Sequence, residues 1–402
     1  MPLPKNPHSI QPARPPGHRP YVVLAVDHYR PQVHAGVVRV ARESGWDVDA
    51  SMARWRSLPQ DVAPDGILLT ASEPRMLDWT ARFSCPVVHL HSLLRMPGKE
   101  PVTVHLDYAA AGRMGARHLL ETGGADYAFF RRFPAEDSTL MRDAFLEEIT
   151  SAGFRPLLLD MPDEMPDMQA IQPIQRARRI EWLAQRLPGL PTPIAIMAEE
   201  DRFAVDLILA ALRVGLRVPE EIAVLGSEDD PFEYGLSPVS VSSVECRLEA
   251  SGVVAAACLR ELMAGRELAS RELLLPPVRV TARRSTDFFN HPDPRIAAAI
   301  LHLRRNYREP INAESLARIA AVSRRGLQDV IKSVTGCTMT DELARLRLMH
   351  AEKLLHTTDL KLQAIAYESG LGQDKNLIRL FQKKHGVSPS TWREMMKSGE
   401  LP

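Results

Sequence analysis

Short apolar runs alternate with helix-like segments from Tyr21 to about Thr281. Most of these runs are continuously apolar, whereas a strand with one face in water would alternate apolar and polar residues. Continuous runs separated by helical patterns are typical of parallel strands in βαβ units. The runs are YVVLAVD (21–27), DGILLTA (65–71), PVVHLH (86–91), VTVHLD (102–107), DYAFF (126–130), PIAIMAEED (193–201) and EIAVLGSEDD (221–230). This pattern predicts an α/β domain built on parallel sheets.

Polar side chains stand at or near the ends of several runs. Parallel sheets bind ligands outside the carboxyl ends of their strands, so these residues are candidates for ligand binding. They are Asp27, His28, His89, Asp107, Glu200, Asp201, Glu228 and Asp229. Asp201 could instead cap the helix that follows it.

Motifs for phosphate and metal binding are missing from the sequence. No G-x-x-x-x-G-K-[ST] loop is present, and no complete G-x-G-x-x-G follows a run, so a nucleotide-phosphate cradle is not predicted. The four cysteines have no C-x-x-C spacing. We therefore expect no metal, no cofactor and no catalytic residues.

The segment STDFFNHPDPR (285–295) ends the alternating pattern with two prolines and several polar residues. It predicts a linker at 286–292 between an α/β domain over 21–285 and a helical domain over 293–396. The remaining ends are a proline-rich tail over 1–20 and a short tail over 397–402. The first segment has no apolar region of the kind found in secretion signals, and no run approaches about 18 apolar residues. We expect a cytoplasmic protein that does not enter membranes.

A weak repeat lies in the helical part. LARIAAVSRRGLQDVIKSVTG (316–336) is similar to IAYESGLGQDKNLIRLFQKKHG (365–386), with one extra residue in the second turn. Each copy reads as a helix, a tight turn and a second helix, so helix-turn-helix motifs are expected at about 313–334 and 362–385. Ser323 is placed to cap the second helix of the first copy. The amphipathic segment between the copies (340–358) predicts a spacer helix roughly 25 Å long.

The second helix of each copy has a basic and amide-bearing face opposite its apolar one. Arg and Lys can read guanine, Asn can read adenine, and lysines near a helix end can position the protein on phosphates. Residues 290–402 hold 18 basic and 12 acidic residues, a net charge of +6 in a chain whose total is zero. We therefore expect double-stranded DNA as a partner. The candidate contacts are Arg324, Arg325, Gln328, Asp329, Lys332, Lys375, Asn376, Arg379, Lys383 and Lys384.

The helical part resembles the AraC family of transcription regulators over about 293–396. The family pattern L-A-x-x-A-x-[VM]-S-x-R-x-L occurs at 316–327, with Asp329 where the family commonly has a basic residue. The second signature, I-A-x-x-x-G-[FLY] followed by F-x-x-x-x-G-x-[ST]-P, occurs between 365 and 389. The resemblance implies an operator-binding domain that recruits RNA polymerase.

The α/β part resembles LacI-type sensors, which have a periplasmic-binding-protein-like fold with two lobes and a ligand cleft. The similar segments are HLDYAAAGRMGARHLLETGG (105–124), MRDAFLEEITSAGF (141–154) and GLRVPEEIAVLGSEDD (215–230). The resemblance implies ligand contacts at Arg142, at Glu200 or Asp201, and at Glu228 or Asp229. A sensor followed by an AraC-type domain resembles the family of xylose-operon activators, which have Asp at position 228 and Asn at 229.

These observations predict a two-lobed α/β sensor followed by an all-α domain with two helix-turn-helix motifs. The expected function is a sugar-controlled transcription regulator, an activator of carbohydrate-utilisation genes that works as a homodimer. Carboxylates with an arginine suit vicinal hydroxyls, so a xylose-like pentose or a related polyol is the expected effector. The alternatives are a regulator that responds to a non-sugar molecule, a carbohydrate transport protein, and an enzyme with an acid/base pair.

Overall fold

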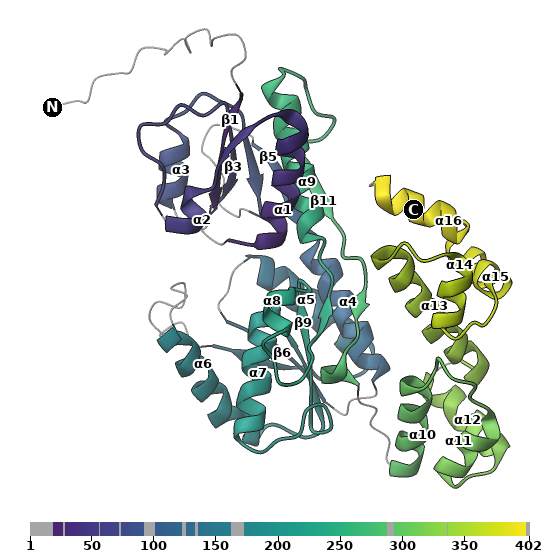
Figure 1. The fold of residues 1–402 in the computed structure, drawn as a ribbon. Helices are drawn as coiled ribbons and strands as arrows, with labels where there is room; N and C mark the ends of the chain where they lie inside the picture. The colour runs from purple at the N-terminus through teal and green to yellow at the C-terminus, as the bar shows by residue number, and fades with distance from the viewer. Residues whose placement is uncertain are drawn as a thin grey trace.

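The computed structural model describes residues 19–398 except 27–28, 56, 72–73, 92–100, 123–125, 133–135, 162–172, 288–292 and 336. Two six-stranded sheets form its N-terminal part (Figure 1). We call the first sheet with its helices lobe 1 and the second lobe 2. The sheet of lobe 1 has the order β11-β5-β4-β3-β1-β2, with parallel pairings throughout. The sheet of lobe 2 has the order β12-β10-β9-β8-β6-β7 and is parallel except for the edge pair β10–β12.

The strands and helices of lobe 1 come from two stretches of the chain. The first stretch contains β1 (Tyr21–Val26), α1 (Pro31–Ser44), β2 (Asp47–Asp49), α2 (Ser51–Trp55), β3 (Gly66–Thr70), α3 (Pro74–Thr80), β4 (Val87–Leu90) and β5 (Val102–Leu106). The second contains α9 (Leu248–Met263) and β11 (Glu272–Leu275).

Lobe 2 is made from the residues between these stretches and from those that follow them. Its elements are α4 (Tyr108–Glu121), β6 (Asp126–Arg131), α5 (Glu136–Ser151), β7 (Leu157–Asp160), α6 (Pro173–Arg186), η1 (Leu187–Gly189), β8 (Ile194–Ala198), α7 (Asp201–Arg213), β9 (Ile222–Ser227), α8 (Pro231–Tyr234), β10 (Ser242–Val244), β12 (Val280–Thr281) and η2 (Arg284–Thr286). The chain therefore passes between the lobes three times, and these passages place the two sheets beside each other.

Glycines allow the helices of lobe 1 to pack at backbone distance. A Cβ on Gly36 of α1 would lie 2.1 Å from the carbonyl oxygen of Glu249 in α9, and a Cβ on Gly252 of α9 would lie 2.1 Å from that of Val33. Since real side chains do not approach so closely, only glycine permits this reciprocal crossing. This close packing fixes α9 to α1, so α9 belongs to lobe 1 although the chain reaches it only after most of lobe 2.

The C-terminal part is entirely helical over the residues that the structure describes. Its helices are α10 (Pro294–Arg305), α11 (Ala313–Ala320), α12 (Arg324–Thr335), α13 (Met339–Thr357), α14 (Leu362–Glu368), α15 (Asp374–His385) and α16 (Pro389–Ser398). It has two small cores, one around α10–α12 and one around α14–α16. Helix α13 contributes Leu343 to the first core and Leu348 and Leu355 to the second, so it is the spacer that joins the two units.

The predicted fold class is confirmed: a two-lobed α/β part precedes an all-α part with two helix-turn-helix motifs. The described part of the chain contains no helix with both the length and the apolar character needed to cross a membrane.

Candidate functional site

Arg30 of lobe 1 reaches the carboxyl ends of two strands in lobe 2. It lies just before α1 and forms an ion pair with Glu228, the residue that follows β9. Its other terminal nitrogen lies 3.8 Å from a carboxylate oxygen of Glu200, which follows β8. The side chains of Arg30 and Glu228 are only 16% and 9% exposed, so this pair is shielded from water and from salt. The carboxyl ends of the two sheets therefore meet at Arg30.

Acidic and phenolic groups surround Arg30. Burial raises the pKa of the Glu228 carboxyl, and the charge of Arg30 beside it opposes this shift and favours the carboxylate form. Burial also raises the pKa of Asp137, at the start of α5, to about 6, and Arg30 again opposes the shift. Tyr108, the first residue of α4, is buried, and its pKa is raised well above the usual value by burial and then by Asp137. We call Arg30, Tyr108, Asp137, Glu200 and Glu228 the interlobe cluster.

The backbone after β9 sets the direction of Glu228. Glu228 has a φ of 100° and Asp229 a φ of 56°, a left-handed conformation that favours glycine. The amide of Glu228 donates to the carbonyl oxygen of Val244, and that of Asp229 donates to the Ser243 hydroxyl, so β10 holds the turn. Strained backbone of this kind is concentrated at binding and catalytic sites.

Arginines also gather beside the cluster in lobe 2. Glu200 pairs at 2.5 Å with Arg202. The guanidinium groups of Arg202 and Arg132 lie 4.8 and 5.1 Å from the ring centroid of buried Phe203. Burial, and then the charge of Arg202, lower the pKa of Arg132 to about 10. This side of the interlobe cluster can therefore bind acidic as well as hydroxyl groups.

Of the residues predicted to bind a ligand, the structure brings Glu200 and Glu228 together around Arg30. Asp201 points into lobe 2, where it accepts hydrogen bonds from the Ser243 hydroxyl at 2.5 Å and the Asp230 amide at 2.7 Å. It is 1% exposed, and burial raises its pKa well above the usual value. It does not cap α7 with its side chain, because the N-cap residue is Glu200.

The other predicted ligand residues have separate partners. Asp229 pairs with Arg283 at 2.7 Å within lobe 2. Asp107 caps α4 by accepting from the Ala110 amide at 2.8 Å. Arg142 pairs at 2.6 Å with its neighbour Asp143. His89 is buried in lobe 1, while Asp27 and His28 lie outside the described residues.

Sequence reasoning missed Arg30, Tyr108, Asp137 and Arg202. Arg30 follows the first predicted strand by only a few residues, and Tyr108 directly follows Asp107. Both therefore stand in the region that the strand-end rule marks as a ligand site, and a wider window after each run would have included them.

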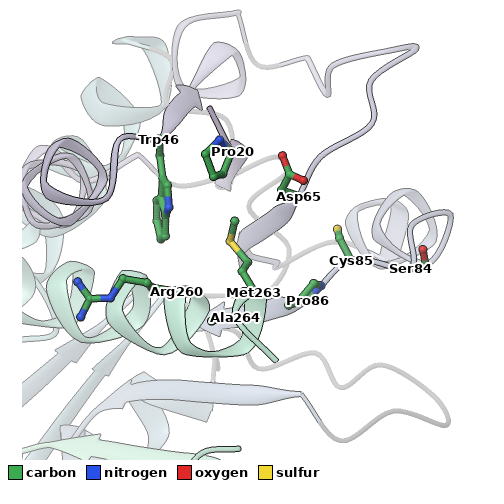
Figure 2. A pocket seen from close by; sticks show the side chains of 9 residues that line it. All are labelled: Pro20, Trp46, Asp65, Ser84, Cys85, Pro86, Arg260, Met263 and Ala264. Carbon is green, nitrogen blue, oxygen red and sulfur yellow. The ribbon is translucent and has the colours of Figure 1, made fainter. Parts of the chain in front are cut away.

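A hollow of about 570 Å³ opens at the opposite end of lobe 1 (Figure 2). Pro20, Asp65 and Pro86 line it, and each directly precedes a strand. The Asp65 carboxylate accepts a hydrogen bond from the Tyr21 amide at 2.7 Å. Since this hollow lies at the amino ends of the strands, it is not where a parallel sheet binds its ligand.

The helical part presents the predicted DNA contacts on its surface. Leu327 and Ile331 bury one face of α12, and Leu377 and Phe381 bury one face of α15. The Ser323 hydroxyl accepts from the Gly326 amide at 3.0 Å, which confirms the predicted cap of α12. All ten candidates are exposed: Arg324, Arg325, Gln328, Asp329 and Lys332 on α12, and Lys375, Asn376, Arg379, Lys383 and Lys384 on α15.

Two of these side chains also have partners within the protein. The Asn376 amide group donates to the carbonyl oxygen of Leu371 at 3.0 Å and so secures the turn before α15. The Lys384 ammonium lies 2.8 Å from a carboxylate oxygen of Glu352 on α13. Both would have to exchange these contacts to bind DNA, whereas Arg379 has no hydrogen bond or ion pair among the described residues.

The comparisons with known proteins agree with this two-part structure. A periplasmic binding protein-like domain family matches residues 116–286, and a helix-turn-helix domain family matches residues 316–395. The xylose operon regulatory protein of Haemophilus influenzae is 24% identical over 371 residues, 88% of this chain and 94% of that protein. The protein of the same name from Escherichia coli K12 is 25% identical over 367 residues, 88% of this chain and 91% of that protein.

A further relative covers about a third of the chain, and one solved structure covers nearly the whole chain. The HTH-type transcriptional activator RhaS of an Enterobacter strain is 33% identical over 129 residues, 32% of this chain and 46% of that protein. A structure of the xylose-binding transcription activator XylR has a TM-score of 0.57 at 23% identity and covers 94% of this chain and 99% of that one.

These findings define the class of the protein. It is a transcription regulator in which a periplasmic-binding-protein-like sensor precedes an AraC-type helix-turn-helix domain. Within that class it is similar over nearly its whole length to the xylose operon regulatory proteins, as the resemblances in its sequence predicted.

Proposed function

We propose that the chain activates carbohydrate-utilisation genes when a xylose-like pentose or a related polyol binds at the interlobe cluster. The observation that carries this proposal is the meeting of Arg30 with Glu200 and Glu228 across the lobes. Carboxylates accept hydrogen bonds from vicinal hydroxyls, and a guanidinium donates two in a fixed geometry. A sugar that inserts among these groups would contact both lobes and favour one lobe arrangement over the other.

The names of the relatives support the pentose, because two of them regulate a xylose operon. Glu228 stands where the xylose-operon activators have Asp, and its longer side chain takes up more of the site. A polyol or sugar of different size is therefore a candidate beside xylose. Arg132 and Arg202 favour a second class of effector, a sugar acid, since their guanidinium groups stand beside the same cluster.

The partners that follow from this proposal are an operator in double-stranded DNA, RNA polymerase and a second copy of the chain, all in the cytoplasm. The exposed faces of α12 and α15 support the operator. The proposal assigns no catalytic role to Glu228 or its neighbours Asp229 and Asp230. The alternative is an enzyme that uses these residues as an acid/base pair. A turnover assay on the sugars that bind tests it, and product formation would favour the enzyme.

A thermal-shift screen tests the proposed effector. It would use pentoses, hexoses, polyols and sugar acids at 0.1 to 10 mM. A ligand at 100 times its dissociation constant stabilises the sensor by about 2.7 kcal/mol. We expect a shift with a pentose or polyol and a change in the affinity for DNA at the same concentration. A flat response across all four classes would contradict the proposal.

A further inference from the structure

We propose that α4 couples the interlobe cluster to the first helix-turn-helix unit through a polar junction of Glu121, Arg304, Glu342 and Arg345. The inference rests on the proposed function, since it describes how a sugar at the cluster would act on the DNA-binding domain. It concerns residues at the far end of α4 from the cluster.

Helix α4 connects the two places directly. Its first residue, Tyr108, belongs to the interlobe cluster, and its last, Glu121, belongs to the junction. Its 14 residues span roughly 20 Å. Figure 1 shows α4 between the body of the sensor and the helical domain.

Both lobes hold α4. At its start, the Asp107 amide donates to the carbonyl oxygen of Leu275 on β11 of lobe 1. Along its length it packs on α5 of lobe 2 so closely that a Cβ on Gly112 would lie 2.1 Å from the carbonyl oxygen of Met141. A change in the angle between the lobes must therefore alter how α4 stands relative to one of them.

Arg304 of α10 makes the central contact of the junction. Its terminal nitrogen donates to the backbone carbonyl oxygen of Glu121 at 2.8 Å, at the C-terminal end of α4. A cation is stabilised there because the carbonyl groups of the last turn carry partial negative charge. The Nε of Arg304 lies 3.7 Å from Glu342 of α13, and the two side chains are only 15% and 3% exposed.

Arg345 completes the junction from α13. It forms two hydrogen bonds to the Glu342 carboxylate, at 2.7 and 2.9 Å. It also lies 3.4 Å from the Glu121 carboxylate, whose side chain is 55% exposed. Since exposed pairs contribute little, the contact of Arg304, whose side chain is 15% exposed, should carry most of the coupling, and the contact of Arg345, whose side chain is 36% exposed, should carry less.

A second contact, made by hydrogen bonds, lies one turn earlier on α4. His118 forms a hydrogen bond of 2.8 Å with the Thr286 hydroxyl, which in turn donates to the Ser242 hydroxyl of β10 at 2.7 Å. Thr286 belongs to η2, the last described element of the sensor before α10. The last turn of α4 is therefore attached to the end of the sensor and to the start of the DNA-binding domain. A shift of α4 would move α10, which packs on α11, and with it the first recognition unit.

The test measures coupling between sugar and DNA in the full-length chain. The probes are D-xylose, or the screened sugar with the largest thermal shift, and a duplex that the wild-type protein selects from a random pool. The coupling is the ratio of the dissociation constants for DNA without and with the sugar, which in allosteric proteins is typically about 5- to 150-fold. Arg304→Met should bring this ratio close to one, while the affinity for the sugar stays within about twofold of wild type.

Arg345→Met should lower the coupling ratio by less. If Arg304→Met fails to fold, the ratio of Arg345→Met tests the inference in its place. Arg295→Met is the matched control, because Arg295 lies on the same helix but pairs with Asp293. It should keep the wild-type ratio. If folded Arg304→Met keeps the wild-type coupling, the inference is overturned. If only Arg345→Met folds, wild-type coupling in that variant overturns it instead. Loss of sugar binding in either variant would also overturn it. Failure of the wild type to bind any screened sugar would instead overturn the proposed function.

Discussion

Arg30 in lobe 1 forms a shielded ion pair with Glu228 in lobe 2, although the two residues lie in different lobes and far apart in the sequence. A buried pair of this kind stabilises the structure only while both partners are present, because a lone charge in the same place is costly. A sugar at this position must offer hydroxyls to both groups as it enters. The pair therefore sets which ligands are accepted and how the lobes meet.

Replacing the Glu228 carboxylate tests this role. Glu228→Gln keeps the shape but removes the carboxylate, so sugar hydroxyls lose hydrogen bonds to a charged group, which contribute about 1.5–3 kcal/mol each. We expect the affinity for the sugar to fall at least tenfold in isothermal titration calorimetry. Glu245→Gln is the control, since Glu245 pairs at 3.0 Å with Arg279 in lobe 2 and is not part of the interlobe cluster. Equal affinities in the two variants would remove Glu228 from the site.

Arg142 provides a test of the resemblance to LacI-type sensors. In the structure its guanidinium pairs with Asp143, whose side chain is 57% exposed, and such a pair is easily exchanged for a ligand. Arg142→Ala should abolish the thermal shift with sugar and leave basal DNA binding intact. Asp143→Ala, which only frees Arg142, should keep the shift. A full shift in Arg142→Ala would mean that this residue does not contact the effector.

The strands that could be predicted from the sequence are those buried on both faces. The run DYAFF became β6, and EIAVLGSEDD became β9, because central strands of a covered sheet need apolar side chains on each side. The edge strands β7 and β11 were not predicted, because each has a run of only three leucines, and two of its four residues are exposed in the structure. Their pairing depends on neighbours that are distant in the sequence.

The site was predictable only to the level of strand ends. The strand-end rule found Glu200 and Glu228, but it could not separate Glu200 from Asp201. Which of the two faces the other lobe depends on Ser243, whose hydroxyl donates a buried hydrogen bond to the Asp201 carboxylate. Arg30 lies a few residues beyond the end of the first predicted strand, and its partners are in the other lobe, so the residues directly at the strand ends did not include it.

His89 should make stability depend on pH in a defined window. Burial, and then the charge of His105, lower the pKa of His89 to about 4, whereas an unfolded chain has a histidine pKa of about 6.5. Between these values the unfolded state binds more protons, so stability is lost as the pH falls from 6.5 to 4. His89 is 1% exposed, so its protonation should lower the free energy of unfolding of the wild type by up to about 3 kcal/mol across this window. His89→Gln should remove this contribution. Denaturant unfolding at pH 7, 5.5 and 4.5 measures it, and parallel curves for variant and wild type would contradict it.

Gly370 should be irreplaceable in the second helix-turn-helix unit. It has a φ of 79°, and a Cβ there would lie 2.7 Å from backbone atoms of Arg308. Gly386 has a φ of 72° but nothing within 4 Å of its Cβ position. Gly386→Ala should therefore cost only the left-handed strain of about 1–2 kcal/mol, and Gly370→Ala clearly more. Hydrogen exchange of α14 and α15 measures the difference between the two variants. Equal losses of protection would show that the backbone of Arg308 moves away from the new side chain at little cost.

Arg379 and Lys384 should differ in what they contribute to DNA binding. Arg379 is exposed in the middle of α15, on the side opposite the buried residues Leu377 and Phe381. A major groove would contact this exposed side. If it reads a base, Arg379→Ala should cost about 1–3 kcal/mol and relax specificity at one operator position. Lys384 lies at the end of α15 beside Glu352, and on DNA a phosphate would replace that carboxylate.

Lys384→Ala should then weaken all sequences alike and reduce the salt slope by about one unit, because one phosphate contact is lost. Gln328 on α12 should behave like Arg379, with its affected base pair about one helical turn away. Binding to single-base operator variants at two salt concentrations separates the two roles. A uniform loss in Arg379→Ala, or a changed base preference in Lys384→Ala, would reverse the assignment. Because α13 joins the two units through its own buried leucines, the spacing between the two affected positions also measures whether that helix stays rigid on DNA.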